Sequence, residues 1–237
     1  MDPTTIARLN AINRAFYETT ATEFDATRGR AWPGWDALLP YLPDDLSVLD
    51  VGCGNGRFGV FLAEQDRAPF RYHGMDNNPA LLDYAQTALT DFPSIEATFE
   101  QRDVVMSPPD AGQYALVVLF GVIHHIPGAD NRRQFMASLA ERVAPGGILA
   151  FASWRFYEYE RFRKRVAPWP DDLKPELNDY LLDWRRGERA FRYCHYVDDA
   201  EQAGLIAATS LVERATYRAD GFTNAVNCYS ILQRAQA

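Results

Sequence analysis

The alternation of apolar and polar positions along the chain predicts strands and helices in turn. Short apolar runs of strand length recur at a regular pace, over residues 47–51, 72–75, 97–101, 114–120 and 148–153. Apolar residues at helical spacing fill the gaps, over 57–64, 79–89 and 130–143, the last ended by Pro145-Gly146-Gly147. Later, a capping-box pattern at 198–201 starts another helix, and two more strands are expected over 207–215 and 227–233. The pattern predicts an α/β fold with a doubly wound, mostly parallel sheet of seven strands.

Two segments depart from this rhythm. At the N-terminus, Asp2 and Pro3 are typical of a helix start, and apolar residues follow at helical spacing as far as Phe16. Residues 17–35, rich in Thr, Arg and aromatic side chains, are expected to be irregular. Residues 154–196, after the fifth strand, are aromatic and charged and too long for a simple connection, so they are expected to form a functional insertion.

Composition narrows the class of protein. The 237 residues, 47% apolar and 24% charged, suit one α/β domain with an elaboration. The net charge of −8 argues against a general nucleic-acid coat. The three cysteines are far apart and form no CxxC pair, so free thiols in a reducing cytoplasm are expected, with no metal site. Neither a secretory signal nor a membrane span is expected.

A glycine loop follows the first strand, in the stretch VLDVGCGNGRFG at residues 48–59. A phosphate loop of the Walker type would need Gly-Lys-Ser/Thr, whereas Gly56 is followed by Arg57. Asp50 at the strand end would oppose a pyrophosphate and favour a cationic ligand. Asp76 and Asp103 end the next two strands, where carboxylates can accept from ribose hydroxyls and an exocyclic amine. The layout suits an adenosine with a positively charged tail.

These elements resemble the class I S-adenosylmethionine-dependent methyltransferases. The matching pieces are LDVGCGNGRFG, HGMD, RDV, and LVVLFGVIHHI before a helix and PGG, within about residues 46–154. The resemblance implies the Rossmann-like methyltransferase fold and S-adenosylmethionine (SAM) as cofactor. It implies that the cofactor's methionine part, ribose, adenine and methyl group lie against Asp50, Gly52, Gly54, Asn55, Asp76, Asn77, Asp103, Val104 and Phe120.

The flanking motifs resemble the tRNA wobble-uridine carboxymethyl methyltransferases and their bacterial relatives. The pieces are Tyr17…Phe24…Thr27-Arg28…Trp32-Pro33, VIHH at 122–125 and FRYCHY at 191–196. The resemblance implies esterification of a carboxylate on a modified tRNA uridine, and in eukaryotes a small activating protein partner. We expect one domain over 1–237, in which residues 1–45 cover the cofactor and residues 155–196 form a lid over the substrate.

Candidates for the acceptor side follow from residue chemistry. Arg28 could hold the acceptor's carboxylate or the cofactor's own. His125, just after the fourth strand, is a candidate catalytic residue and would serve as a base for an amine or hydroxyl acceptor. Substrate contacts are expected from His124, Trp154, Tyr193 and His195, although simple packing is an open alternative for His195. The basic run 161–165 is expected to be a solvated helix face, and contact with a phosphate is the open alternative.

Other functions stay open at this point. The acceptor could be a small-molecule metabolite rather than tRNA. A nicotinamide-dependent oxidoreductase is disfavoured by Asp50 and by the register of the glycines. A non-catalytic protein that senses the cofactor also stays open. The sequence does not distinguish it from an enzyme, because methyl transfer depends on positioning and requires no nucleophilic residue that could be recognised.

Overall fold

The computed structural model describes residues 1–65, 67, 69–184 and 189–236. Residues 185–188 of the expected lid lie outside the described residues. In chain order the elements are α1 (Pro3–Ala26), η1 (Pro33–Tyr41), β1 (Ser47–Val51), α2 (Arg57–Ala63), β2 (Phe70–Asp76), α3 (Pro79–Thr90), β3 (Ile95–Gln101), β4 (Tyr114–Phe120), η2 (Ile123–His125), α4 (Ala129–Glu141), β5 (Val143–Trp154), η3 (Phe156–Glu158), α5 (Glu160–Arg163), β6 (Val166–Ala167), β7 (Asp179–Trp184), β8 (Ala190–His195), α6 (Asp199–Thr209), β9 (Val212–Ala219), η4 (Gly221–Thr223) and β10 (Asn227–Gln233).

A seven-stranded sheet forms the centre of the described part of the chain, in the order β3-β2-β1-β4-β5-β10-β9. Strands β1 to β5 pair in parallel, and Val48 of β1 lies between Tyr72 of β2 and Leu116 of β4. Strand β10 runs antiparallel to both of its neighbours in this sheet, β5 and β9. The doubly wound, mostly parallel seven-stranded sheet expected from the sequence is therefore confirmed.

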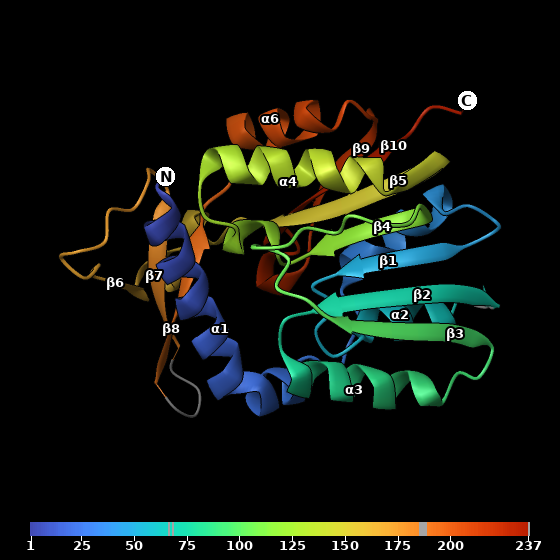
Figure 1. Ribbon diagram of the computed structural model, residues 1–237, viewed down its shortest axis with the longest axis horizontal. Coiled ribbons are helices and arrows are strands. Elements are labelled where there is room, and N and C mark those ends of the chain that lie inside the picture. Colours follow the sequence, from blue (N-terminus) through green and yellow to red (C-terminus); the bar gives the residue numbers. More distant parts are fainter. Residues whose placement is uncertain (66, 68, 185–188, 237) are drawn as a thin grey trace.

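Helices cover both faces of the sheet, each through its own apolar cluster. On one face, Phe58 and Phe61 of α2 pack with Trp35 of η1 and with strand residues such as Tyr72. On the other face, α4 and α6 lie side by side and pack against the inner strands (Figure 1). Because both faces are covered, the chain is open to a ligand mainly at the ends of the strands.

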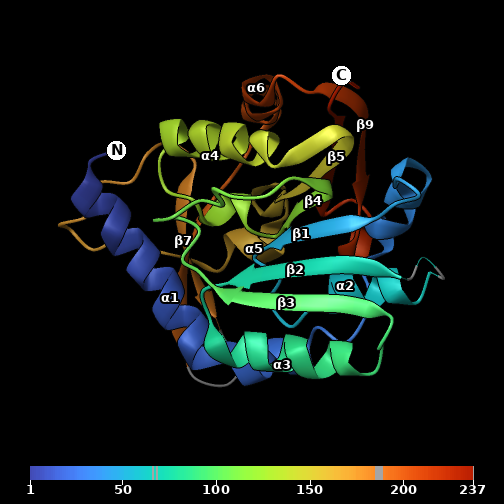
Figure 2. The ribbon, with the colours of Figure 1, turned by 45° about the vertical axis from the view of Figure 1, so that its right-hand side comes forward.

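A second layer lies beyond the carboxyl ends of β1 to β4. Helix α1 crosses in front of these strand ends, next to a three-stranded antiparallel sheet of β6, β7 and β8 (Figures 1 and 2). Strand β8 packs directly on α1. No helix among the described residues is long and apolar enough to cross a membrane.

Three predicted boundaries are wrong. Residues 17–26, expected to be irregular, continue helix α1, because Thr20 and Ala21 are buried on the same face as Phe16. The strand expected over 207–215 begins only at Val212, because α6 continues to Thr209 and ends where Ser210 adopts a left-handed conformation. The helix expected over 130–143 stops at Glu141, and β5 takes up Val143 and the Pro-Gly-Gly stretch.

Candidate active site

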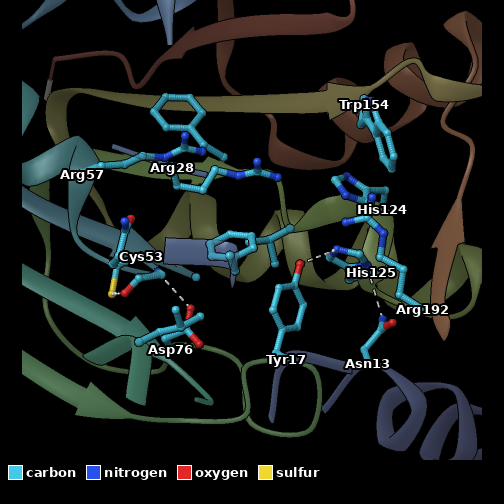
Figure 3. Close-up of a pocket in the computed structure, with 18 of the residues that line it drawn as sticks. Asn13, Tyr17, Arg28, Cys53, Arg57, Asp76, His124, His125, Trp154 and Arg192 are labelled. Atoms are coloured by element: carbon cyan, nitrogen blue, oxygen red, sulfur yellow. Dashed lines mark hydrogen bonds between the residues drawn. The ribbon is translucent and has the colours of Figure 1, made fainter. Parts of the chain in front are cut away.

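A cavity of about 420 Å³ lies where the carboxyl ends of the strands meet the second layer. This volume is within the usual range for small-molecule sites. Its lining comes from α1, the glycine loop, the ends of β2 to β5, the insertion and the turn before β10. Figure 3 shows 18 of the lining side chains, with Asp76, Arg28 and Arg57 on one side of the hollow and His124, His125 and Arg192 on the other.

The glycine loop forms a close-fitting cradle at one end of the cavity. Gly52 has a φ of +73°, and a Cβ added there would lie 2.2 Å from Cγ2 of Val122. At Gly54 the corresponding Cβ would lie 3.6 Å from the ring of Phe24, which covers the loop from α1. The side chain of Asn55 donates a hydrogen bond of 2.8 Å to Asp25, so the end of α1 is tied to the loop.

Two carboxylates stand at the ends of β1 and β2 in buried surroundings. Asp50 accepts a hydrogen bond of 2.6 Å from the hydroxyl of Tyr72, and burial raises its pKa to about 7. Asp76 accepts hydrogen bonds of 2.9 Å from the backbone amides of Gly54 and Asn78. Burial also raises the pKa of Asp76, although these amides oppose the shift. A cationic or hydroxyl-bearing ligand would compensate both carboxylates.

The third acid, Asp103, follows β3. It accepts a hydrogen bond of 2.7 Å from Asn10 of α1 and bonds of 3.2 and 3.3 Å from the amides of Val105 and Met106. It therefore has acceptor capacity left for a ligand, since a carboxylate offers about four lone pairs. The cavity is lined by every residue expected at the cofactor, namely Arg28, Asp50, Gly52, Gly54, Asn55, Asp76, Asn77, Asp103, Val104 and Phe120.

His125 has both ring nitrogens engaged. Its Nδ1 lies 2.9 Å from the carbonyl oxygen of Tyr193, which can only accept, and 3.3 Å from Nδ2 of Asn13. Donation to the shorter contact, the carbonyl, assigns the proton to Nδ1. Its Nε2 then accepts from the hydroxyl of Tyr17 at 3.0 Å. Burial and the nearby Arg192 lower the pKa of His125 to about 3. The imidazole is neutral at physiological pH, and its proton-accepting nitrogen already has a donor.

His124 is the second imidazole at the cavity. It is buried, and its Nδ1 has no hydrogen-bond partner among the described residues. Burial, with His125 and Arg192 beside it, holds the pKa of His124 well below its usual range. Its ring packs at 5.7 Å from that of Trp154, which also lines the cavity.

Ligand atoms of His124, His125 and Cys194 lie within 4.8 Å of one another. Whichever nitrogen of His125 held a metal ion would have to give up its present partner, and burial raises the pKa of the Cys194 thiol to about 12. The cluster is therefore poorly suited to metal binding, which requires a thiolate.

Two residues expected at the substrate are placed elsewhere. The hydroxyl of Tyr193 donates to Asp179 at 2.8 Å, and His195 lies between Asp179 and Glu201 at 2.7 and 2.5 Å. Both side chains are buried, and neither is among the described residues that line the cavity. The physical reason is strand alternation in β8, since Arg192 and Cys194 point to the opposite side from Tyr193 and His195.

Sequence reasoning missed several residues of the cavity wall. Tyr17 and Asn13 of α1 and Asp220 before β10 all line the cavity. So do five arginines that were not expected there, Arg57, Arg102, Arg161, Arg165 and Arg192. Arg161 and Arg165 lie in the run expected to be a solvated helix face. The one available signal for Arg192 was its place in FRYCHY, which alternates as a strand does.

The fold and the cavity together define a class of protein, one with a Rossmann-like sheet and a small-molecule cavity at its strand ends. Residues 48–147 match a family described as "Methyltransferase domain". A protein of Encephalitozoon cuniculi assigned as a methyltransferase is 30% identical over 182 residues, covering 76% of this chain and 77% of that protein. The chain belongs to the SAM-dependent methyltransferases, as the sequence motifs implied.

Two further similarities bear on the acceptor and the fold. Mouse tRNA (carboxymethyluridine(34)-5-O)-methyltransferase is 28% identical over 141 residues, which cover 58% of this chain. This match spans only 19% of the length of the mouse protein. Burkholderia thailandensis 1,6-didemethyltoxoflavin-N1-methyltransferase, solved with 1,6-didemethyltoxoflavin and S-adenosylhomocysteine, superposes with a TM-score of 0.67 at 16% identity. That alignment covers 100% of this chain and 92% of the solved one, and it supports the fold.

Proposed function

We propose that this protein transfers the methyl group of SAM to a carboxylate of an anionic acceptor, giving a methyl ester. The observation that carries the proposal is a cavity wall rich in arginines beside two imidazoles that are neutral at physiological pH. Arginine is the side chain best suited to bind a carboxylate. A carboxylate loses no proton on methylation, so the weak basicity of His124 and His125 is no obstacle.

The cofactor half of the site follows the strand-end acids. We assign Asp76 to the ribose, Asn77, Asp103 and Val104 to the adenine, and the glycine loop with Asn55 to the methionine part. Arg28 and Arg57 lie on the same side of the cavity as Asp76 (Figure 3). Arg28 stacks at 4.7 Å on Phe24, and Arg57 at 4.5 Å on Trp32. Either guanidinium could bind the cofactor's own carboxylate.

The reaction depends mainly on the alignment of the acceptor oxygen with the methyl group, and less on acid–base catalysis by side chains. Bound SAM supplies an electrophilic methyl group whose leaving group is a neutral thioether. One carboxylate oxygen of the acceptor forms the new C–O bond as the C–S bond breaks, and the bonding pair stays on sulfur. The protein positions this oxygen about 3–3.5 Å from the methyl carbon. We assign residues 1–45 and 155–196 to cover the site and exclude water, within one domain over 1–237.

For the acceptor itself, the wobble uridine of a tRNA carrying a 5-carboxymethyl group is our first candidate. The similarity to the mouse tRNA methyltransferase and the basic residues Arg161 and Arg165 at the cavity support it. A carboxylate-bearing metabolite is the second candidate, favoured by the net charge of −8. A cytoplasmic location, which agrees with three buried free cysteines, and a small activating protein partner complete the proposal.

Labelled SAM tests the proposal directly. The protein is incubated with SAM labelled in its methyl group and with the RNA or small-molecule fraction of a cell extract. Release of the label as methanol in mild alkali would show that the product is a methyl ester. The extract fraction that takes up the label, RNA or small molecules, would show which class of acceptor is used. Alkali-stable label would contradict carboxylate methylation. If tRNA is the acceptor, the affinity of the protein for tRNA should fall steeply as the salt concentration rises. Weak binding to tRNA that does not depend on salt would favour the metabolite as acceptor.

A further inference from the structure

Strand β8 presents one charged side chain to the cavity. Arg192 pairs in register with Leu182 of β7 and precedes Tyr193, whose side chain faces the other way. The guanidinium of Arg192 lies 4.7 Å from the ring centroid of Trp154 and 5.4 Å from that of Phe16. These two rings hold the guanidinium by its flat face and leave its N–H edge for a ligand.

Arg192 differs from the two fully buried arginines, Arg132 and Arg155, in lacking an acidic partner among the described residues, and it shares this lack with Arg57 across the cavity. Arg132 pairs with Glu201 at 2.6 Å, and Arg155 pairs with Asp199 at 3.0 Å. Within residues 1–184 and 189–236, as far as they are described, no carboxylate lies within 4.0 Å of Arg192. Guanidinium groups that are removed from water normally have an anion beside them. The missing partner of Arg192 is therefore expected to come from a ligand.

The position of Arg192 separates it from the cofactor side. It lies with His124, His125 and Trp154 across the cavity from Asp76, Arg28 and Arg57 (Figure 3). Its charge contributes to the lowered pKa of both imidazoles, so Arg192 places a positive charge beside two neutral rings. An anionic group on a molecule facing the cofactor would therefore lie within reach of Arg192.

We propose that Arg192 binds the carboxylate of the methyl acceptor and makes the insertion the element that selects anionic substrates. The inference rests on the proposed methylation of a carboxylate. One carboxylate oxygen accepts from the guanidinium edge while the other faces the methyl group. The aromatic rings of Trp154 and Phe16 fix the orientation of Arg192 from behind. Arg192 thus acts as a specificity-determining residue.

The test compares Arg192→Gln and Arg192→Lys with a matched control, Arg189→Gln. Arg189 is an exposed cation of the same hairpin that pairs with Asp183 at 3.5 Å, and it is not among the residues lining the cavity. The acceptor is an RNA stem-loop with 5-carboxymethyluridine at the wobble position. Calorimetry with S-adenosylhomocysteine checks that each variant keeps its fold and its cofactor site.

We expect Arg192→Gln to raise the KM for the RNA by about tenfold to a hundredfold, the usual loss for a hydrogen bond to a charged group. Affinity for S-adenosylhomocysteine should stay within about twofold, because Arg192 lies away from the cofactor side. Arg192→Lys should recover part of the affinity, and Arg189→Gln should leave the KM unchanged. An unchanged KM in Arg192→Gln, or an equal rise in Arg189→Gln, would overturn the inference.

A second measurement separates this inference from the proposed function. Phenylacetate and its neutral analogue phenylacetamide are titrated into the complex with S-adenosylhomocysteine, and tryptophan fluorescence reports binding beside Trp154. Binding of phenylacetate alone, lost in Arg192→Gln, would support a carboxylate site even if the wild type fails to methylate the RNA. Equal binding to wild type and Arg192→Gln, or no preference for the anion, would refute the role of Arg192 whatever the acceptor is.

Discussion

A carboxylate oxygen of Asp76 accepts a hydrogen bond of 2.9 Å from the backbone amide of Gly54. This bond joins the end of β2 to the glycine loop that follows β1, so the proposed ribose contact and the methionine cradle form one unit. A ligand that binds one part therefore finds the other already in place, which reduces the entropy lost on binding.

Replacement of Asp76 should weaken cofactor binding, because it removes the link between the ribose contact and the glycine loop. We predict that Asp76→Ala weakens binding of S-adenosylhomocysteine by about tenfold to a hundredfold, because bonds to a charged acceptor are lost. Isothermal titration calorimetry measures the effect. Asp83→Ala, which removes an exposed carboxylate from the neighbouring α3, is the control and should bind as the wild type does. Equal affinities in wild type and Asp76→Ala would contradict the cofactor assignment.

Gly52 offers a steric test of the cradle. We predict that Gly52→Ala lowers both the melting temperature and the affinity for S-adenosylhomocysteine, because its Cβ would lie 2.2 Å from Val122 at a φ of +73°. Adding Val122→Ala should restore part of the loss by removing the contact, while the backbone strain stays. Gly204→Ala, where nothing lies within 4 Å of the new Cβ, should cost no stability. Thermal melts and calorimetry on the same samples show whether the two losses go together.

Asp50 should make cofactor binding depend on pH. Its pKa of about 7 means that the carboxyl is mostly protonated at pH 6 and mostly ionised at pH 8. The ionised form attracts a cationic ligand, so affinity for SAM should rise as the pH rises through 7. Asp50→Asn, measured in the same buffers, should remove this rise and leave only the titration of the ligand's own groups. Parallel pH profiles for the two proteins would refute the role of Asp50.

His195 should link stability to pH. Burial disfavours its charged form, but hydrogen bonds to Asp179 and Glu201 outweigh this and raise the pKa of His195, while Arg132 opposes them. The folded state thus binds the proton more tightly than the unfolded state does. The stabilisation of the folded state by protonated His195 is fully present below pH 6.5, about the pKa of a histidine in the unfolded chain. It is lost as the pH rises through the higher pKa that His195 has in the folded state.

Melting temperatures test this link. The wild type should lose more stability between pH 6 and pH 9 than His195→Gln, in which the titrating group is absent. Tyr193, which also faces Asp179, stays uncharged over this range because burial raises its pKa. If the variant shows the same pH dependence as the wild type, another group is responsible.

The meeting of the strand-end acids at one cavity could be predicted from the sequence because their places follow from the sheet. Parallel strands present their carboxyl ends at one edge, so Asp50, Asp76 and Asp103 had to meet there once the strands were recognised. The acceptor half could not be predicted in this way. Which residues of 191–196 face the cavity depends on how β8 docks on α1, a tertiary contact that leaves no local signal. The continuation of α1 through Thr20 likewise depends on burial, which overrides weak helix propensity.

The alternation along β8 also bears on how relatives of this chain could acquire new substrates. A strand shifted by one residue turns its other face inward, so inserting or deleting one residue before Arg192 would exchange it for the neighbouring Phe191 or Tyr193. The wall opposite the cofactor would then be aromatic and would favour uncharged ring systems. The adenosyl-binding loops, built on a separate sheet, would be untouched. Substrate class and cofactor use can therefore evolve independently in this architecture, through a change in the length of one hairpin.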